Sequence, residues 1–181
     1  MRARAVFLDR DGVLNRAMVR EGKPYPPASV EEVEILPGVL EALQRLKVAG
    51  FVLIVVSNQP DVGRGTTSRE VVEGINAYLL KYLPVDRFIM CYHDSGDNCD
   101  CRKPQPGMLT AGAEEFGVEM ASSYMVGDRW RDVEAGKRAG CTTVFVDYGY
   151  SEVSGNSSAN YSCKSAVEGL DWILSMESKN V

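Results

Sequence analysis

The sequence predicts a single α/β domain over residues 1–181, in which helices cover both faces of a parallel sheet of five or more strands. Short apolar segments alternate along the chain with stretches of helical periodicity, which is typical of parallel sheets. The length of 181 residues suits one domain, and a hydrophobic content of 45% suits a soluble chain with a core of its own. No internal repeat or second domain is indicated.

The first half of the chain contains two predicted strands and two predicted helices. Residues 5–8 are apolar throughout, and residues 51–56 form a β-branched run that fits a strand buried on both faces. Residues 16–36 lack periodicity and contain three prolines, so we expect an irregular excursion there. Helical spacing of apolar residues predicts one helix from Val39 to a stop at Gly50 and another from Ser68 to just before Pro84.

The second half continues the alternation of strand and helix. It contains predicted strands at 87–90, 123–126 and 142–146 and predicted helices at 107–116, 131–139 and 166–177. Gly117 and Gly140 directly follow two of these helices, which is a usual place for a helix to end. Residues 91–107 are rich in Cys and Pro and predict an irregular loop, and the polar segment 151–165 predicts a surface loop.

Composition excludes several classes of protein. The net charge is −5, from 20 basic and 25 acidic residues, which argues against a nucleic-acid binder. The longest apolar run, residues 51–56, is far shorter than the roughly 20 residues of a membrane helix. The first residues contain no apolar signal-peptide segment. We therefore expect a cytoplasmic monomer that binds neither nucleic acid nor membranes.

Polar side chains follow four of the predicted strands. They are Asp9 and Asp11 after the first strand, Ser57 and Asn58 after the second, Arg102 and Lys103 after the third, and Asp128 after the fourth. Ligands of parallel sheets bind beyond the carboxyl ends of the strands, so we expect these residues to form an active site. Asp residues at strand ends also cap turns and helices, but that role does not require four clusters in register.

The residue types in this set suit phosphoryl transfer. Asp9, Asp11 and Asp128 would repel one another, and Mg²⁺, which prefers carboxylates, water and phosphate oxygens, would relieve the repulsion. The Ser57 hydroxyl and the Lys103 ammonium are donors suited to a phosphoryl group. Other phosphatase chemistries find no support, because the only histidine stands in CYHD, no cysteine is followed six residues later by arginine, and no phosphate-binding P-loop is present.

A second cluster lies in the loop over residues 91–107. Four residues of metal-ligand type stand within eleven positions: Cys91, His93, Cys99 and Cys101. This spacing predicts a closed, structural Zn²⁺ site, and the polar residues between the cysteines disfavour the alternative of reduced thiols in the core. Since Cys101 directly precedes Arg102 and Lys103, zinc would also fix the predicted phosphate-binding lysine.

Four segments, taken in order, resemble the motifs of the haloacid dehalogenase (HAD) superfamily. They are FLDRDGVLN (7–15), VSNQ (56–59), CRKP (101–104) and VGDRWRD (126–132). The resemblance covers residues 5 to about 150. It implies a three-layer, Rossmann-like HAD fold and phosphatase chemistry through an aspartyl-phosphate.

The resemblance also implies roles for individual residues. Asp9 would be the nucleophile, Asp11 the general acid and then base, and Ser57 and Lys103 the ligands of the phosphoryl oxygens. Mg²⁺ would be bound by Asp9, the backbone carbonyl of Asp11, and Asp128. Asp132 either supports the metal or is a solvated surface residue. Substrate contacts are expected from Arg10, Asn15, Asn58, Gln59, Arg64, Arg102 and Arg129.

The predicted zinc loop is similar to that of one branch of the superfamily, which lacks a large cap domain. This branch holds heptose bisphosphate phosphatases and histidinol-phosphate phosphatases. NQPDVGRG (58–65) and CRKPQPGM (101–108) resemble the heptose enzymes. The short spacing between His93 and Cys99 resembles the histidinol enzymes, and residues 22–36 depart from the heptose pattern.

The resemblance therefore implies removal of the 7-phosphate of D-glycero-D-manno-heptose 1,7-bisphosphate, a small phosphate ester, with histidinol phosphate as the alternative substrate. Arginines at the rim would suit a second phosphate, whereas Asp61, Asp94 and Asp97 would suit the histidinol cation. The alternative from another class is a non-catalytic module that binds zinc and phosphate. The presence of both Asp9 and Asp11 disfavours that alternative.

Overall fold

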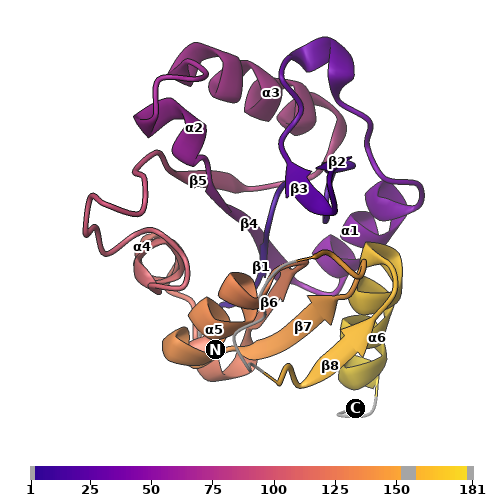
Figure 1. The fold of residues 1–181 in the computed structure, drawn as a ribbon. Helices are drawn as coiled ribbons and strands as arrows, with labels where there is room; N and C mark the ends of the chain where they lie inside the picture. Colours follow the sequence, from indigo (N-terminus) through magenta and orange to yellow (C-terminus); the bar gives the residue numbers. More distant parts are fainter. Residues whose placement is uncertain (1–2, 152–157, 179–181) are drawn as a thin grey trace.

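A six-stranded parallel sheet forms the centre of the computed structural model, which describes residues 3–151 and 158–178 (Figure 1). The strands lie in the order β5 (Arg87–Cys91), β4 (Phe51–Asn58), β1 (Arg4–Leu8), β6 (Tyr124–Gly127), β7 (Thr142–Val146) and β8 (Tyr161–Cys163). After β1 the chain builds β4 and β5 on one side and the remaining strands on the other. Loops that leave the ends of β1, β4 and β6 therefore diverge around a crevice, where parallel sheets bind ligands.

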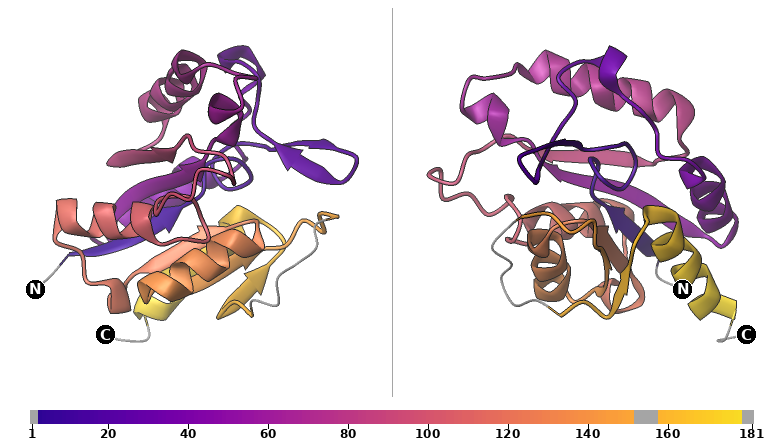
Figure 2. Two further views of the ribbon diagram at one scale, coloured as in Figure 1. Left: turned by 60° about the vertical axis from the view of Figure 1, so that its left-hand side comes forward. Right: turned by 45° about the vertical axis from the view of Figure 1, so that its right-hand side comes forward.

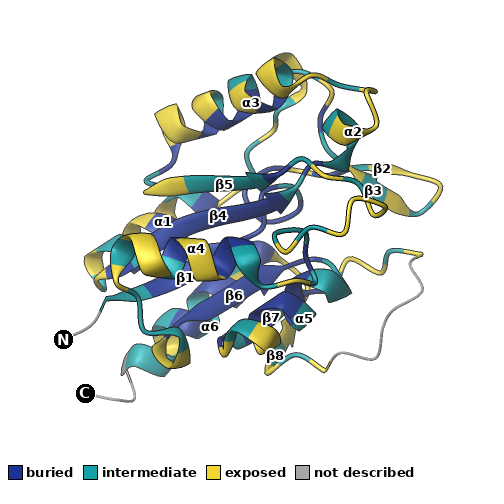
Figure 3. Ribbon diagram, turned by 90° about the vertical axis from the view of Figure 1, so that its left-hand side faces the viewer, coloured by how far each residue is buried: buried dark blue, intermediate teal, exposed yellow. Residues whose placement is uncertain are grey.

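Helices cover both faces of the sheet, as the sequence predicts. Alternate residues of each strand face opposite sides, so Val6 and Leu8 pack into one core and Ala5 and Phe7 into the other. The first core contains residues of α1 (Val39–Val48), α3 (Arg69–Tyr82) and α6 (Ala166–Ser178). The second contains residues of α4 (Gly107–Phe116) and α5 (Trp130–Ala139), and Figure 3 shows α4 in front of the buried strands.

The excursion over residues 16–36 contains more structure than expected. It forms an antiparallel hairpin of β2 (Met18–Arg20) and β3 (Lys23–Tyr25), which extends away from the body of the fold (Figure 2), and a short 3₁₀ helix, η1 (Val30–Glu32). Glu21 and Gly22 both have positive φ angles, 50° and 74°, as a two-residue turn of type I′ requires. The sequence offers glycine at only one of these positions, which weakens the hairpin signal.

The prediction of a polar loop over residues 151–165 is wrong in its last part, because residues 161–163 form β8, which pairs with β7. Tyr161 stacks on Trp172 of α6 at 4.6 Å, and the side chain of Cys163 is buried. These contacts stabilise a strand that is too short to show a pattern of its own. Residues 152–157 of the expected loop lie outside the described residues.

The other expected elements are confirmed, with ends that differ by at most two residues. One short helix, α2 (Pro60–Gly63), was not expected. None of the helices in the part of the chain that the structure describes is long and apolar enough to cross a membrane.

Candidate active site

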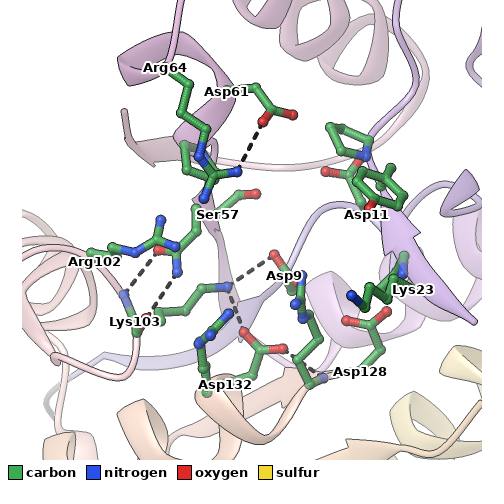
Figure 4. A pocket seen from close by; sticks show the side chains of 17 residues that line it. Asp9, Asp11, Lys23, Ser57, Asp61, Arg64, Arg102, Lys103, Asp128 and Asp132 are labelled. Carbon is green, nitrogen blue, oxygen red and sulfur yellow. Dashed lines mark hydrogen bonds and ion pairs between the residues drawn. The ribbon is translucent and has the colours of Figure 1, made fainter. Parts of the chain in front are cut away.

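The predicted polar clusters meet in one pocket of about 370 Å³ at the carboxyl ends of β1, β4 and β6 (Figure 4). Its lining includes Asp9, Asp11, Ser57, Lys103 and Asp128, which come from four separate segments of the chain. The hairpin adds Lys23 and its neighbours at one side of the mouth. The convergence expected from the strand-end positions is therefore present.

Lys103 lies at the floor of the pocket between two carboxylates. Its Nζ is 3.0 Å from Asp9 and 2.6 Å from Asp132 (Figure 4). It also donates a hydrogen bond to the Val56 carbonyl at 2.7 Å. Burial alone would lower the pKa of Lys103, but the charges of Asp132 and Asp9 outweigh burial and raise the pKa. Lys103 is therefore a fixed cation beside the expected nucleophile.

Asp9, Asp128 and Asp132 form a buried group of carboxylates whose oxygens lie within 4.8 Å of one another. Burial, followed by the charge of Asp132, raises the pKa of Asp9 to about 6, although Lys103 opposes this shift. Burial also raises the pKa of Asp128 well above its usual value, and the charge of Asp9 adds to this effect. Three carboxylates with one lysine leave an excess of negative charge, which a divalent cation would neutralise.

Asp128 supplies a direct test of whether a metal fits. Both of its oxygens are buried, and neither accepts a hydrogen bond of acceptable geometry from the described residues, although the nearby Tyr150 hydroxyl lowers the pKa of Asp128 to a smaller extent than burial raises it. A buried carboxylate without partners is costly unless it binds a cation. Gly12 lies directly above Asp128, and a Cβ at Gly12 would come within 2.0 Å of Asp128 Oδ2. The loop after β1 and Asp128 thus approach closely enough to share one Mg²⁺.

Asp11 is held by three side chains that the sequence had suggested as substrate contacts. Arg10 donates to both Asp11 oxygens at 3.2 and 3.1 Å, Asn15 donates at 3.0 Å and Gln59 at 2.9 Å. Arg10 also donates to Asn76 of α3 at 3.0 Å. Arg10, Asn15 and Gln59 are buried and are not among the residues that line the pocket, so in this structure they contact Asp11, and their contact with substrate stays a prediction.

The carboxyl end of β4 holds Ser57 and positions the loop that carries Lys103. Ser57 is buried at the pocket floor and its Oγ accepts a hydrogen bond from Gln59 at 2.9 Å. Asn58 lines the pocket, but its side-chain amide both donates to and accepts from the backbone of Lys103, at 3.0 and 2.9 Å. This pair of hydrogen bonds joins the end of β4 to the loop that carries Lys103.

The predicted zinc ligands lie together beside the pocket, and no pair of them is bonded as a disulfide. Cys101 Sγ is 3.1 Å from Cys91 Sγ, 3.5 Å from Cys99 Sγ and 3.3 Å from His93 Nδ1. Cys91 Sγ is 3.7 Å from Cys99 Sγ and 3.6 Å from His93 Nδ1. A tetrahedral Zn²⁺ separates such ligand atoms by about 3.5–3.8 Å, so the donors are arranged as a zinc site requires.

The rim of the pocket is basic, but its arginines are not equivalent. Arg64 pairs with Asp94 at 2.7 Å and Asp61 at 3.3 Å, and its guanidinium lowers the pKa of Asp94 to about 2. Arg102 donates to the His93 carbonyl at 3.2 Å, which links it to the zinc loop. Arg102 and Arg129 line the pocket as expected, whereas Arg64 lines it with its charge already paired.

Among the charged residues of the pocket, the sequence left the role of Asp132 open and gave no indication of Lys23 or Arg131. Asp132 is buried against Lys103, so the alternative that it is a solvated surface residue is wrong. Its signal was the spacing of four residues from Asp128. Lys23 and Arg131 also line the pocket. Neither carries a signal in the sequence, because the hairpin was not recognised and Arg131 lies between two motif positions.

Known proteins resemble this chain in both sequence and structure. A family model described as HAD-hydrolase-like matches residues 100–171. A D-glycero-beta-D-manno-heptose-1,7-bisphosphate 7-phosphatase of Pseudomonas aeruginosa is 36% identical over 149 residues, which cover 80% of this chain and 81% of the relative. The enzyme of the same name from Escherichia coli K12 is 34% identical over 151 residues, 77% of this chain and 76% of the relative.

Two solved structures share the fold over nearly the whole chain. A D,D-heptose 1,7-bisphosphate phosphatase from B. bronchiseptica, complexed with magnesium and phosphate, superposes with a TM-score of 0.80 and 29% identity and covers 96% of this chain and 99% of its own. A HAD-like phosphatase from Mesorhizobium loti, named as such only provisionally, gives a TM-score of 0.79 and 27% identity, with coverage of 98% and 87%.

The fold and the site define a phosphatase of the HAD-like hydrolase class, in which acidic residues at the ends of β1 and β6 face a buried lysine. The sequence identity to the two relatives above, and the share of their length that this chain covers, narrow the class to one family. The chain belongs to the family of the D-glycero-beta-D-manno-heptose-1,7-bisphosphate 7-phosphatases.

Proposed function

We propose that the protein removes the 7-phosphate of D-glycero-D-manno-heptose 1,7-bisphosphate in a reaction that depends on Mg²⁺. The observation that carries this proposal is the buried cluster of Asp9, Lys103 and Asp128 beneath a pocket with a basic rim. The names of the relatives support the choice of substrate.

In the proposed reaction, one oxygen of Asp9 attacks the phosphorus and forms an acyl phosphate. Asp11 donates a proton to the leaving sugar oxygen as the ester bond breaks. Asp11 then takes a proton from the water that attacks the acyl phosphate, which releases inorganic phosphate and restores Asp9. The hydrogen bonds from Arg10, Asn15 and Gln59 would hold the Asp11 carboxylate in one orientation for both proton transfers.

Asp9, Asp128 and the backbone carbonyl of Asp11 would hold Mg²⁺, which supplies positive charge to the phosphoryl oxygens during transfer. The unpartnered oxygens of Asp128 support this assignment. Ser57 and Lys103 would hold the phosphoryl oxygens from the opposite side, since both line the pocket floor. Asp132 positions Lys103 through the ion pair of 2.6 Å.

The alternative substrate, histidinol phosphate, would need rim carboxylates for its ammonium group. Asp61 and Asp94 are paired with Arg64, and Asp97 accepts from the backbone of Asp94 at 2.7 Å. Because these carboxylates are engaged, the rim presents mainly positive charge, which favours a substrate with a second phosphate.

A panel of phosphate esters tests the proposed function. We expect kcat/KM for heptose 1,7-bisphosphate to exceed that for histidinol phosphate by at least about tenfold, the factor that one charge-assisted contact gives. A preference for histidinol phosphate would reject the assigned substrate. Failure to hydrolyse even p-nitrophenyl phosphate with Mg²⁺ would instead favour the non-catalytic alternative.

We also propose that Cys91, His93, Cys99 and Cys101 bind one structural Zn²⁺. The purified protein should carry about one zinc ion per chain, and Cys99→Ser should lower both zinc content and activity, because the loop that carries Lys103 loses its anchor. Elemental analysis of protein purified without chelators measures this. Cys141→Ser is a matched control, since Cys141 is buried in the core and is not part of the cluster. This variant should bind as much zinc as wild type.

The remaining expectations are proposals as well. We propose that the protein acts as a monomer in the cytoplasm, on a small phosphate ester, and without nucleic-acid or membrane partners. The net charge of −5 supports the absence of a nucleic-acid partner.

A further inference from the structure

Three cations at the pocket rim carry no carboxylate partner. In residues 3–151 and 158–178, Lys23, Arg102 and Arg131 form no ion pair, whereas Arg64 has two. Four of the acidic residues that line the same pocket are engaged, Asp61 with Arg64, Asp11 with Arg10, and Asp9 and Asp132 with Lys103, and the fifth, Asp128, lies buried at the floor. The floor of the pocket is therefore acidic and its rim is basic.

Arg131 stands in the first turn of α5, beside the residues of the floor. Its neighbour Asp132 reaches Lys103, while the Arg131 guanidinium lies half-buried over the Trp130 ring at 5.2 Å from the ring centre. Stacking on an aromatic ring fixes a guanidinium without using its N–H donors. These donors stay available at the pocket wall.

Arg102 and Arg131 come from different elements but line one pocket, and Arg129 accompanies them. Burial lowers the pKa of Arg131, and the nearby charges of Arg129 and Arg102 lower it further. Bringing like charges together in a partly buried place costs free energy unless an anion joins them. A dianionic phosphate, which accepts bidentate hydrogen bonds from arginine, is the anion that suits such a group.

We infer that Arg131 is a specificity-determining residue, which together with Arg102 binds the phosphate of the substrate that is not cleaved. The inference rests on the proposed function in that one phosphoryl group occupies the floor at Asp9, Ser57 and Lys103. The second phosphate then lies at the α5 side of the rim. Arg64, which the sequence had suggested for this contact, is held by Asp94 and Asp61 and does not take part.

The test compares a sugar bisphosphate with the matching monophosphate in Arg131→Gln and wild type. We expect the ratio of kcat/KM for heptose 1,7-bisphosphate to that for heptose 7-phosphate to fall about 10- to 100-fold, mainly through KM. Arg102→Ala should lower the same ratio, and Arg131→Lys should restore part of it. The KM of wild type for the bisphosphate should rise more steeply with NaCl than that of Arg131→Gln, because one charged contact is missing in the variant.

Arg138→Gln is the matched control, because Arg138 lies on the same helix but pairs with Glu134 at 2.8 Å and does not line the pocket. It should leave the ratio unchanged. An equal loss on both substrates in Arg131→Gln, or no loss on either, would overturn the inference. If wild type does not hydrolyse the heptose ester at all, the proposed substrate is wrong, and the ratio of fructose 1,6-bisphosphate to fructose 6-phosphate decides on Arg131 independently.

Discussion

Asp9→Asn is expected to lower kcat by on the order of 10⁴-fold or more, because an amide cannot form the acyl phosphate. The measurement is Mg²⁺-dependent release of phosphate from p-nitrophenyl phosphate and from heptose 1,7-bisphosphate. Asp9 is buried at the pocket floor and accepts hydrogen bonds from Lys103 at 3.0 Å and from the Arg10 amide at 2.8 Å. Asn keeps one oxygen for these donors, so the geometry of the floor should survive.

The stability of Asp9→Asn separates loss of chemistry from loss of fold. The pKa of Asp9 is raised to about 6 from an ordinary value of 3.8, so the folded state binds this proton more tightly than the unfolded state. In metal-free protein this contribution to stability is complete at pH below about 4 and is lost as the pH rises through about 6. Asn carries no titrating proton, so the stability of the variant does not fall over this pH range on account of residue 9. At pH 7 without Mg²⁺ its melting temperature should therefore be no lower than that of wild type.

Residual activity of more than a few per cent in Asp9→Asn would reject the aspartyl-phosphate mechanism. A large fall in melting temperature would instead show that Asp9 stabilises the fold, contrary to the direction of its pKa shift.

The parts of the site that were predictable from sequence are those set by sheet topology. Asp9 and Asp128 directly follow strands and Ser57 lies at the carboxyl end of β4, and parallel strands bring their carboxyl ends together whatever the loops do. The clustering of Cys91, His93, Cys99 and Cys101 was predictable because their spacing within one loop suits a single metal site. Both predictions depend on position along the backbone and not on how side chains are oriented.

The contacts that the sequence did not predict depend on the orientation of side chains. Arg10 stands between Asp9 and Asp11 in the sequence, and only the fold shows that its guanidinium turns inward to Asp11 and Asn76. Arg64 is of a residue type that commonly binds phosphate. The loop over residues 91–107 places Asp94, 30 residues later in the chain, against its guanidinium. Contacts between distant segments of this kind have no local pattern in the sequence. The same is true of β8, which is stabilised by Trp172.

Lys103→Met is expected to reduce both activity and stability. Lys103 is a buried cation beside Asp9, Asp128 and Asp132, and its removal deprives Asp9 and Asp132 of their ion pairs of 3.0 and 2.6 Å. Removal of one partner from a buried ion pair commonly costs about 3–5 kcal/mol, and here two carboxylates lose the same partner. Met fills a similar volume, so the loss would come from charge and not from a cavity.

The dependence of this loss on metal distinguishes the proposed site from an ordinary structural ion pair. Mg²⁺ bound by Asp9 and Asp128 would replace part of the missing positive charge, so added Mg²⁺ should raise the melting temperature of Lys103→Met more than that of wild type. The control is Lys137→Met, because Lys137 is exposed on α5 and its substitution should change neither the melting temperature nor the response to Mg²⁺.

The turnover of Lys103→Met should stay about 10³-fold below that of wild type even at saturating Mg²⁺, since the phosphoryl oxygens still lack the ammonium donor. A variant that recovers full activity with Mg²⁺ would show that Lys103 only balances charge at the floor and takes no part in holding the substrate.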